Sequence, residues 1–252
     1  AFDDEGRMLY GWVAEDNAER VDNTDGDGFK EGIYYFGGED DGAMTVGWLQ
    51  MDITYDDAVT NSTLAYEVAP AFNDDEDQTR WFYFKANGKK VKAESGDVQK
   101  SKTINGKKYA FDDEGKMLYG WVSSDNAERI DNTDGDAFKE ATYYFGGEDD
   151  GAMTVGWLQM DITYDEATSD YEFAPVFNDD EDQTRWFYFQ SNGKKVKADG
   201  AREAKEKTIN GKKYAFDEYG AMVAEWSLDE GDEKIASKSE ERAKASVDVA
   251  TT

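Results

Sequence analysis

The feature that most constrains this chain is an internal duplication. The segment AFDDEGRMLYGWV at 1–13 returns with one change at 110–122, and YYFGGEDDGAMTVGWLQMDITYD at 34–56 returns unchanged at 143–165. Both pairs are shifted by the same 109 residues. Repeats of this kind contact their neighbours in sequence order and bury a continuous core only by stacking. The duplication therefore predicts a repeat architecture rather than one globular core.

The second copy is slightly shorter than the first. NDDEDQTRWFYF at 73–84 returns at 178–189, a shift of 105 residues, so four residues are missing between Asp165 and Asn178 in the second copy. A segment that tolerates such a deletion is expected to be a surface loop. We expect two long repeats and the start of a third to make one hairpin-repeat region at 1–226. The polar segment at 227–252 is expected to be separate.

Each long repeat contains smaller units, in which alternating aromatic residues are followed by a glycine turn and a short apolar strand. Asn-Gly, the strongest short-range hairpin signal, occurs at Asn87–Gly88, Asn105–Gly106, Asn192–Gly193 and Asn210–Gly211. We interpret each unit as a β-hairpin, with long polar inserts between hairpins. The predicted fold class is all-β: an elongated solenoid of stacked β-hairpins, with a C-terminal helix expected at 229–246 and no helix before residue 227.

The motif WFYF places aromatic side chains on both faces of a strand. Successive side chains alternate across a strand, so Trp81 and Tyr83 are expected on one face and Phe82 and Phe84 on the other. One face can pack inside the solenoid. The other face can serve as a ligand platform, because the polar edge of Trp or Tyr tolerates water. The alternative is that all of these rings are core.

Charge and composition exclude several classes of function. Lys and Arg number 28 against 57 Asp and Glu, which gives a net charge of −29 and argues against nucleic-acid and membrane-surface partners. Cysteine and histidine are both absent, which excludes disulfides, thiolate metal sites and His-based catalytic triads. No apolar run of ~18 residues is present, so no membrane insertion is expected.

The acidic inserts suggest a metal site. DNTDGDGFKE at 22–31 and DNTDGDAFKE at 131–140 begin with alternating oxygen ligands, as a calcium loop does. The match with an EF-hand then fails, because Tyr34 stands where that loop needs a bidentate Glu. A looser Ca²⁺ site and a solvated polar loop both stay open. The aspartates predicted for the metal site are Asp22, Asp25, Asp27, Asp131, Asp134 and Asp136.

Several of these motifs occur in the same order in a known family. GAMTVGW at 42–48 and 151–157, GKMLYGW at 115–121 and the two WFYF segments resemble the cell-wall/choline-binding repeats of Gram-positive surface proteins. They also resemble the related glucan-binding and clostridial toxin repeats. The resemblance implies stacked β-hairpins that bind choline on teichoic acid, or glucans, in shallow aromatic sites between successive hairpins. Quaternary ammonium groups are recognised there by cation–π contacts.

The resemblance also implies which residues line such sites. In the family the aromatic triplet opens with Trp, and only the WFYF segments keep it, so the sites are expected at two hairpin junctions. The ligand-binding residues predicted there are Trp48, Trp81, Tyr83, Trp157, Trp186 and Tyr188.

The predicted function is a non-catalytic binding module of a secreted or cell-surface protein. It would be part of a larger polypeptide and would attach it to a cell-wall glycan, a glucan or teichoic-acid choline. Paired carboxylates suffice for glycoside hydrolysis, but an exact duplication suits multivalent binding better than one active site. The alternative is a structural spacer or adhesin stalk, stiffened by Ca²⁺ and without a small-molecule ligand.

Overall fold

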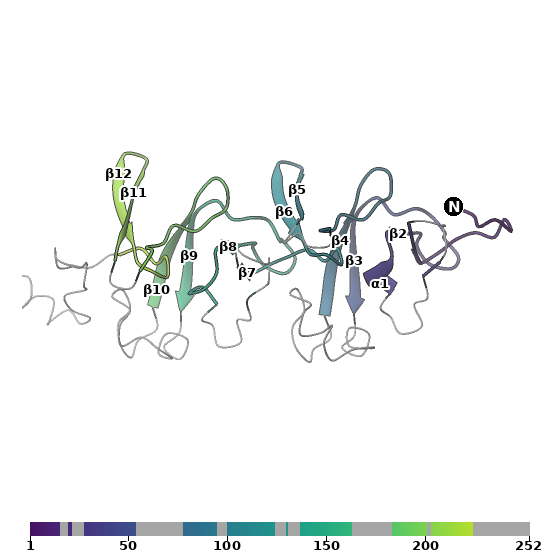
Figure 1. Ribbon diagram of the computed structural model, residues 1–252, viewed down its shortest axis with the longest axis horizontal. Coiled ribbons are helices and arrows are strands. Elements are labelled where there is room, and N and C mark those ends of the chain that lie inside the picture. Colours follow the sequence, from purple (N-terminus) through teal and green to yellow (C-terminus); the bar gives the residue numbers. More distant parts are fainter. Residues whose placement is uncertain are drawn as a thin grey trace, which may run out of the picture. The chain divides into compact units, whose positions relative to one another are not determined.

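A computed structural model describes residues 1–15, 20–21, 28–53, 78–94, 100–123, 130, 137–162, 183–200 and 203–223 (Figure 1). The strands in the first half are β1 Trp12–Val13, β2 Tyr34–Tyr35, β3 Gly47–Ile53, β4 Gln78–Phe84, β5 Lys100–Ile104 and β6 Lys107–Phe111. Those that follow are β7 Trp121–Val122, β8 Tyr143–Tyr144, β9 Gly156–Ile162, β10 Gln183–Phe189, β11 Lys205–Ile209 and β12 Lys212–Phe216. The all-β class and the succession of hairpins are confirmed.

One short helix interrupts this pattern. The single-turn helix α1, Gly28–Glu31, lies inside the first acidic insert, where no helix was expected. The predicted helix at 229–246 and the predicted boundary at 226/227 lie outside the described residues.

The chain divides into two compact units. Unit 1 comprises Ala1–Arg129 and Phe145–Met153, and unit 2 comprises Ile130–Tyr144 and Thr154–Thr252. Each unit contains one long two-stranded antiparallel ribbon and one short hairpin with a tight turn. These are β3–β4 and β5–β6 in unit 1, and β9–β10 and β11–β12 in unit 2.

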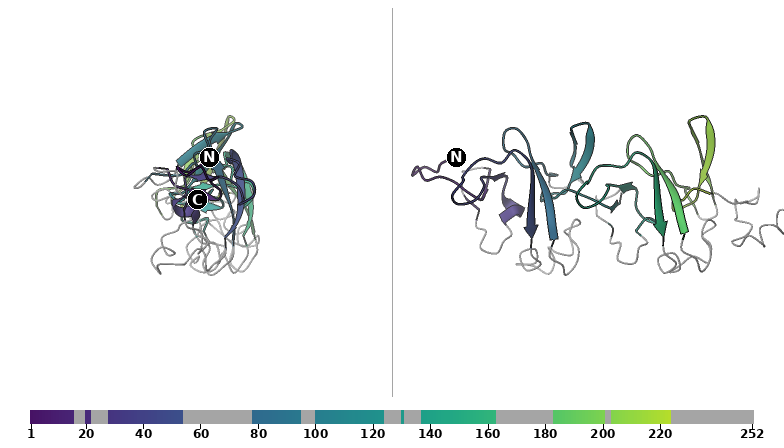
Figure 2. Two further views of the ribbon diagram at one scale, coloured as in Figure 1. Left: turned by 90° about the vertical axis from the view of Figure 1, so that its right-hand side faces the viewer. Right: turned by 180° about the vertical axis from the view of Figure 1, so that it is seen from behind.

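The long ribbons pair in a different phase from the one expected. β3 pairs with β4 from Gly47 opposite Phe84 to Ile53 opposite Gln78, and the right-hand view of Figure 2 shows the two strands side by side. The polar insert therefore connects the two strands of one hairpin instead of separating two hairpins. The physical reason is length, because GWLQMDI and QTRWFYF can form a seven-residue ladder that the shorter segments after the glycine turns cannot match. After the glycine turns that follow the WFYF segments only single bridges form, from Phe84 to Lys90 and from Phe189 to Lys195.

Two of the four predicted Asn-Gly turns close short hairpins, and at the other two, Asn87–Gly88 and Asn192–Gly193, only a single bridge forms. β5 and β6 are joined by Asn105 and Gly106, with φ of 49° and 83°, and β11 and β12 by Asn210 and Gly211, with φ of 50° and 79°. Positive φ at both central residues is the geometry that lets a two-residue turn match the twist of its strands.

The two faces of the β3–β4 ribbon pack against different neighbours. Phe82 and Phe84 are fully buried, and they join Trp12, Phe29 and Ile53 in one core cluster. Trp81 and Tyr83 on the opposite face are partly exposed. The predicted alternation of WFYF is thus confirmed, and it explains why four consecutive aromatic residues are needed.

A phenyl ring from the first acidic insert packs against the face of the ribbon that carries Phe82 and Phe84. Phe29 of α1 is fully buried and its ring centroid lies 6.0 Å from that of Phe82. The Lys90 ammonium donates a hydrogen bond to the Phe29 carbonyl and lies 5.0 Å from the Trp12 ring centroid. In unit 2 Lys195 likewise donates to the carbonyl of Phe138. In each unit this space is therefore filled by a phenyl ring and an ammonium group of the chain itself.

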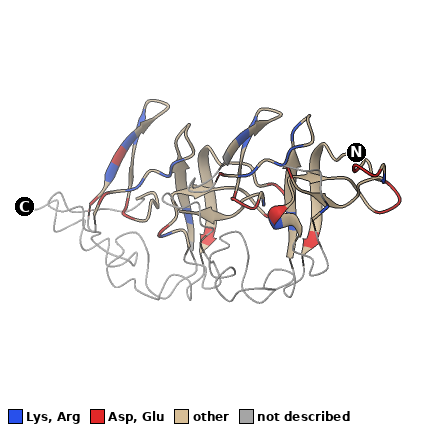
Figure 3. Ribbon diagram, turned by 45° about the vertical axis from the view of Figure 1, so that its right-hand side comes forward, with Lys and Arg blue, Asp and Glu red and all other residues tan. Residues whose placement is uncertain are grey.

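Charge is unevenly distributed along the described chain. The short hairpins have the lysine-rich sequences KSKTI and KKYAF in unit 1, and KEKTI and KKYAF in unit 2. Figure 3 shows these basic residues along both hairpins, although the chain as a whole is strongly acidic.

Candidate functional site

The second face of the β3–β4 ribbon presents two tryptophans to the next hairpin. Trp48 comes from β3 and Trp81 from β4. Gln50 stands directly opposite Trp81 in the ladder, and Trp48 lies two residues before Gln50, so the side chains of Trp48 and Trp81 lie on the same face. The indole centroids are 6.1 Å apart and the ring planes are perpendicular. This edge-to-face arrangement is a favourable one for aromatic rings, and it leaves ring surface turned away from the ribbon.

The hairpin β5–β6 supplies the facing wall. The Tyr109 ring centroid lies 4.9 Å from that of Trp48. Met117 follows β6, and its backbone N–H donates to the carbonyl of Trp81 over 2.8 Å, which fixes the thioether beside the indole. Neither Tyr109 nor Met117 was predicted from the sequence as a site residue. Met117 does belong to the GKMLYGW motif, and that membership is the signal that was available.

An acidic turn completes the surroundings. Asp149 and Asp150 belong to the segment GGEDDG at 146–151. The Trp81 indole Nε1–H donates to Asp149 Oδ1 over 3.3 Å, and Lys107 Nζ lies 3.2 Å from Asp150 Oδ1. Both aspartates are exposed.

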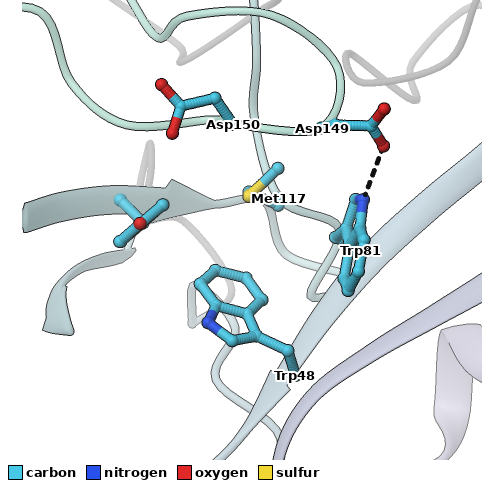
Figure 4. Close-up of a pocket in the computed structure, with 6 residues that line it drawn as sticks. Trp48, Trp81, Met117, Asp149 and Asp150 are labelled. Carbon is cyan, nitrogen blue, oxygen red and sulfur yellow. Dashed lines mark hydrogen bonds between the residues drawn. The ribbon is translucent and has the colours of Figure 1, made fainter. Parts of the chain in front are cut away.

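These side chains surround an open hollow with a volume of about 280 Å³. Figure 4 shows two indoles, a thioether and two carboxylates arranged around it, with the hydrogen bond from Trp81 to Asp149. Pockets for drug-sized ligands start at ~300 Å³, so this hollow suits one small group or a single sugar ring. The lining residues are Trp48, Trp81, Tyr109, Met117, Asp149 and Asp150.

Unit 2 repeats the aromatic part of this arrangement. The Trp157 centroid lies 6.1 Å from that of Trp186 at 87°, and 4.8 Å from that of Tyr214. The backbone N–H of Met222 donates to the carbonyl of Trp186 over 2.7 Å. The Trp186 side chain is 38% exposed, which makes it one of the exposed large apolar groups of the described chain.

The six predicted ligand-binding residues therefore fall into two groups of three. Tyr83 lies 5.0 Å from Trp48, and Tyr188 lies 5.1 Å from Trp157, each measured between ring centroids. Tyr83 supports the Trp48 ring but does not line the hollow, where Tyr109 stands instead.

The rings also contribute to packing. In unit 1, Trp48, Trp81, Tyr83 and Tyr109 pack against a buried cluster formed by Val91, Ile104, Phe111 and Met117. The site is thus built from one side of the hydrophobic core. A substitution there has to be checked for its effect on folding as well as on binding.

The predicted metal ligands Asp22, Asp25, Asp27, Asp131, Asp134 and Asp136 lie outside the described residues. Within the described part of the chain, no group of three or more acidic side chains is arranged to hold a metal ion. Calcium binding by the inserts stays a prediction. No helix in the described residues is long and apolar enough to cross a membrane.

Among the solved structures that resemble this chain are a choline-binding protein, a modular autolysin and a phage endolysin complexed with choline. Choline-binding protein F of Streptococcus pneumoniae is 20% identical, with a TM-score of 0.38, over 88% of this chain and 54% of that one. The modular autolysin LytC of the same species, in complex with a synthetic peptidoglycan ligand, is 21% identical, with a TM-score of 0.38, over 89% and 36%. The cell-wall endolysin of phage Cp-1, complexed with choline, is 20% identical, with a TM-score of 0.24, over 59% and 30%.

No family model matches the chain, and no curated protein matches it. The chain spans about half the length of choline-binding protein F and about a third of LytC and of the phage endolysin. At these identities and TM-scores the likenesses carry no argument about function, which rests on the geometry of the two aromatic junctions.

Proposed function

We propose that this chain is a non-catalytic binding module that attaches a larger extracellular polypeptide to a cell-surface polymer. The ligand would be held at the Trp48/Trp81 junction of unit 1 and at the Trp157/Trp186 junction of unit 2. The polymer class is a cell-wall glycan, a glucan or teichoic acid carrying choline.

The observation that carries the proposal is the contrast between the two faces of β4. Phe82 and Phe84 are fully buried on one face, whereas Trp81 on the other is partly exposed and borders an open hollow. A ring needed only for the core would gain more free energy by complete burial, since stabilisation scales with apolar area removed from water. A tryptophan kept at a hollow, next to the aromatic rings of another hairpin, supports a ligand platform over a purely structural stalk.

Binding is favoured over catalysis by the same surroundings. An acid catalyst among carboxylates needs a raised pKa, which burial in an apolar pocket provides. Asp149 and Asp150 are exposed at the rim of a small open hollow. Two equivalent aromatic junctions in one chain suit multivalent attachment, in which weak sites gain through effective concentration.

The test is binding of wild type and of the double variant Trp81→Ala/Trp186→Ala to a glycan array and to purified Gram-positive cell walls. Each indole is expected to contribute roughly 1–1.5 kcal/mol, so losing one indole weakens a site about tenfold. The control is Phe2→Ala, because Phe2 is 68% exposed and lies outside both junctions.

Thermal melts accompany the binding measurements, because the tryptophans also pack against the core. A folded double variant that has lost binding supports the proposal. A folded double variant that binds every glycan and the cell walls as wild type does would reject the platforms and leave the structural spacer.

A further inference from the structure

We infer that Asp149 and Asp150 make the unit 1 hollow selective for a ligand group that carries a protonated amine with free N–H donors. The class that would use every wall of the hollow is an amino sugar. This inference rests on the proposed function, and it adds the chemical class of the ligand to it.

The first step is the position of the carboxylates. Asp149 Oδ1 accepts the Trp81 indole N–H over 3.3 Å and the Gln50 amide over 3.5 Å, both at the long end of hydrogen-bond distances. A carboxylate has about four lone-pair sites, so Asp149 keeps acceptor capacity for a ligand. The contact with Trp81 places this negative charge beside the ring on which a ligand would stack (Figure 4).

The second step is that the chain itself brings a primary ammonium group to this rim. Lys107 Nζ lies 3.2 Å from Asp150 Oδ1, and the two side chains are 60% and 58% exposed. An exposed pair of this kind is worth little, with a median of ~0–1 kcal/mol. A ligand amine that also gains aromatic contact can therefore replace Lys107 at the carboxylate with little loss.

The third step is the acidic turn's attachment. The N–H of Met153 donates to the carbonyl of Lys108 over 2.8 Å, which ties the segment after the aspartates to β6. Gly151 lies so close to Met117 that a Cβ there would stand 2.3 Å from the sulfur. The carboxylates are thus held against the aromatic wall by backbone and side-chain contacts from the same unit.

These walls discriminate between the three ligand classes. A neutral sugar ring can stack on an indole but leaves both carboxylates to water. A quaternary ammonium ion neutralises charge and contacts the rings, but it has no N–H to donate. An amino sugar offers a stacking face together with an ammonium group that donates charge-assisted hydrogen bonds, which are the stronger kind. The chain's net charge of −29 further favours cations over neutral ligands at the encounter stage.

The experiment compares three β-1,4-linked oligosaccharides of equal length that differ only at C2: glucosamine, N-acetylglucosamine and glucose. Calorimetric titration is done in a Trp186→Ala background, so that only the unit 1 hollow reports, at a pH below the pKa of the amine. Choline is titrated as a fourth probe. The variants are Asp149→Asn, Trp81→Ala and the matched control Asp40→Asn, which changes the same position of the earlier GGEDDG copy and does not line the hollow.

The glucosamine oligosaccharide is expected to bind tightest, and Asp149→Asn is expected to weaken it roughly fivefold, the upper range for an exposed ion pair. Asp40→Asn is expected to leave it unchanged. The glucosamine advantage is also expected to shrink with added salt, because exposed charges are screened. This combination would support the inference.

Other outcomes overturn it in distinguishable ways. If the three oligosaccharides bind equally and Trp81→Ala abolishes all of them, the carboxylates are not selective, but the proposed binding function stands. Tighter binding of choline than of glucosamine would mean that the rings alone select the ligand. If no oligosaccharide binds but the protein still binds cell walls, the amino-sugar inference is wrong and the proposed binding function stands. If Trp81→Ala changes nothing in any arm, the proposed site fails as well.

Discussion

Replacing Lys90 with methionine is expected to stabilise the protein at neutral pH, and the gain is expected to disappear as the pH rises. Lys90 is 3% exposed and lies between the Trp12 ring and the Phe29 carbonyl. Burial lowers its pKa from 10.5 to about 7, because the charged form has lost its water. Nearby Lys92 adds to the lowering, and Asp112 opposes it.

The magnitude follows from the difference between the folded and unfolded pKa values. The unfolded chain keeps a lysine pKa of ~10.4, so between about pH 7 and that value the unfolded state binds more protons and stability rises with pH. At ~1.36 kcal/mol per pH unit, the cost of Lys90 is about 5 kcal/mol at or below pH 7 and vanishes near pH 10.4. Methionine has a similar length and no charge, so a gain of ~2–5 kcal/mol is expected at pH 7.

The assay is urea unfolding of wild type and Lys90→Met at a series of pH values, followed by tryptophan fluorescence. The difference in unfolding free energy between the two proteins should fall steadily across this window. Lys108→Met is the control, since Lys108 is exposed and its replacement should leave the pH dependence of wild type in place. A constant difference for Lys90→Met, or a loss of stability at pH 7, would refute the reasoning.

Three further predictions concern packing, a buried carboxyl and a close contact. Phe82→Ala should destabilise unit 1 by ~3–5 kcal/mol in urea unfolding, because Phe82 is fully buried in its core; a cost below 1 kcal/mol would contradict this. Burial raises the pKa of Asp217 from 3.8 to about 7, so this carboxyl favours folding at low pH and loses that contribution as the pH rises through 7. Asp217→Asn should therefore match wild type near pH 3.8 and exceed its stability above pH 7, and equal pH profiles would exclude the shift. Gly151→Ala should cost ~1–3 kcal/mol in thermal melts and displace Met117, because φ is +53° and the new Cβ would stand 2.3 Å from the sulfur. Gly147→Ala, with no atom within 4 Å of the new Cβ, should be close to neutral, and equal melts for the two variants would disprove the contact.

The local features of the fold could be predicted from the sequence. Alternation along WFYF predicted that Trp81 and Phe82 lie on opposite faces of the strand, and the structure confirms it. Asn105–Gly106 indicated a two-residue turn, and both residues have positive φ. These features depend on neighbouring residues alone, so a single sequence contains enough information to predict them.

Features that depend on distant segments could not be predicted in the same way. Tyr109 and Asp149 line the same hollow as Trp48 but belong to segments far from it in the sequence. Only the stacking of hairpins brings them together. Phe29 is an apolar residue in an otherwise polar insert, and the sequence does not indicate which core it packs into. Nothing in the sequence marks Lys90 as buried, because burial of an ammonium group is costly and uncommon.

The predicted pairing of the long strands was wrong for a related reason. Asn-Gly is the strongest short-range signal of a hairpin turn, so the long polar inserts were interpreted as links between hairpins. Ladder length decides the matter, because β3 and β4 pair over their full length from Gly47 to Ile53. A long connection costs little more entropy than a short one, since the cost grows only with the logarithm of loop length.

The most direct test of the aromatic junctions is a ¹H–¹⁵N spectrum of the tryptophan indole N–H groups during titration with soluble fragments of Gram-positive cell-wall polymer. Assignments come from single tryptophan substitutions. Ligand binding at the junctions predicts that the signals of Trp48, Trp81, Trp157 and Trp186 shift together in a saturable way, while the signal of the buried Trp12 stays in place. Saturable binding that leaves the signals of Trp81 and Trp186 unmoved would contradict the account.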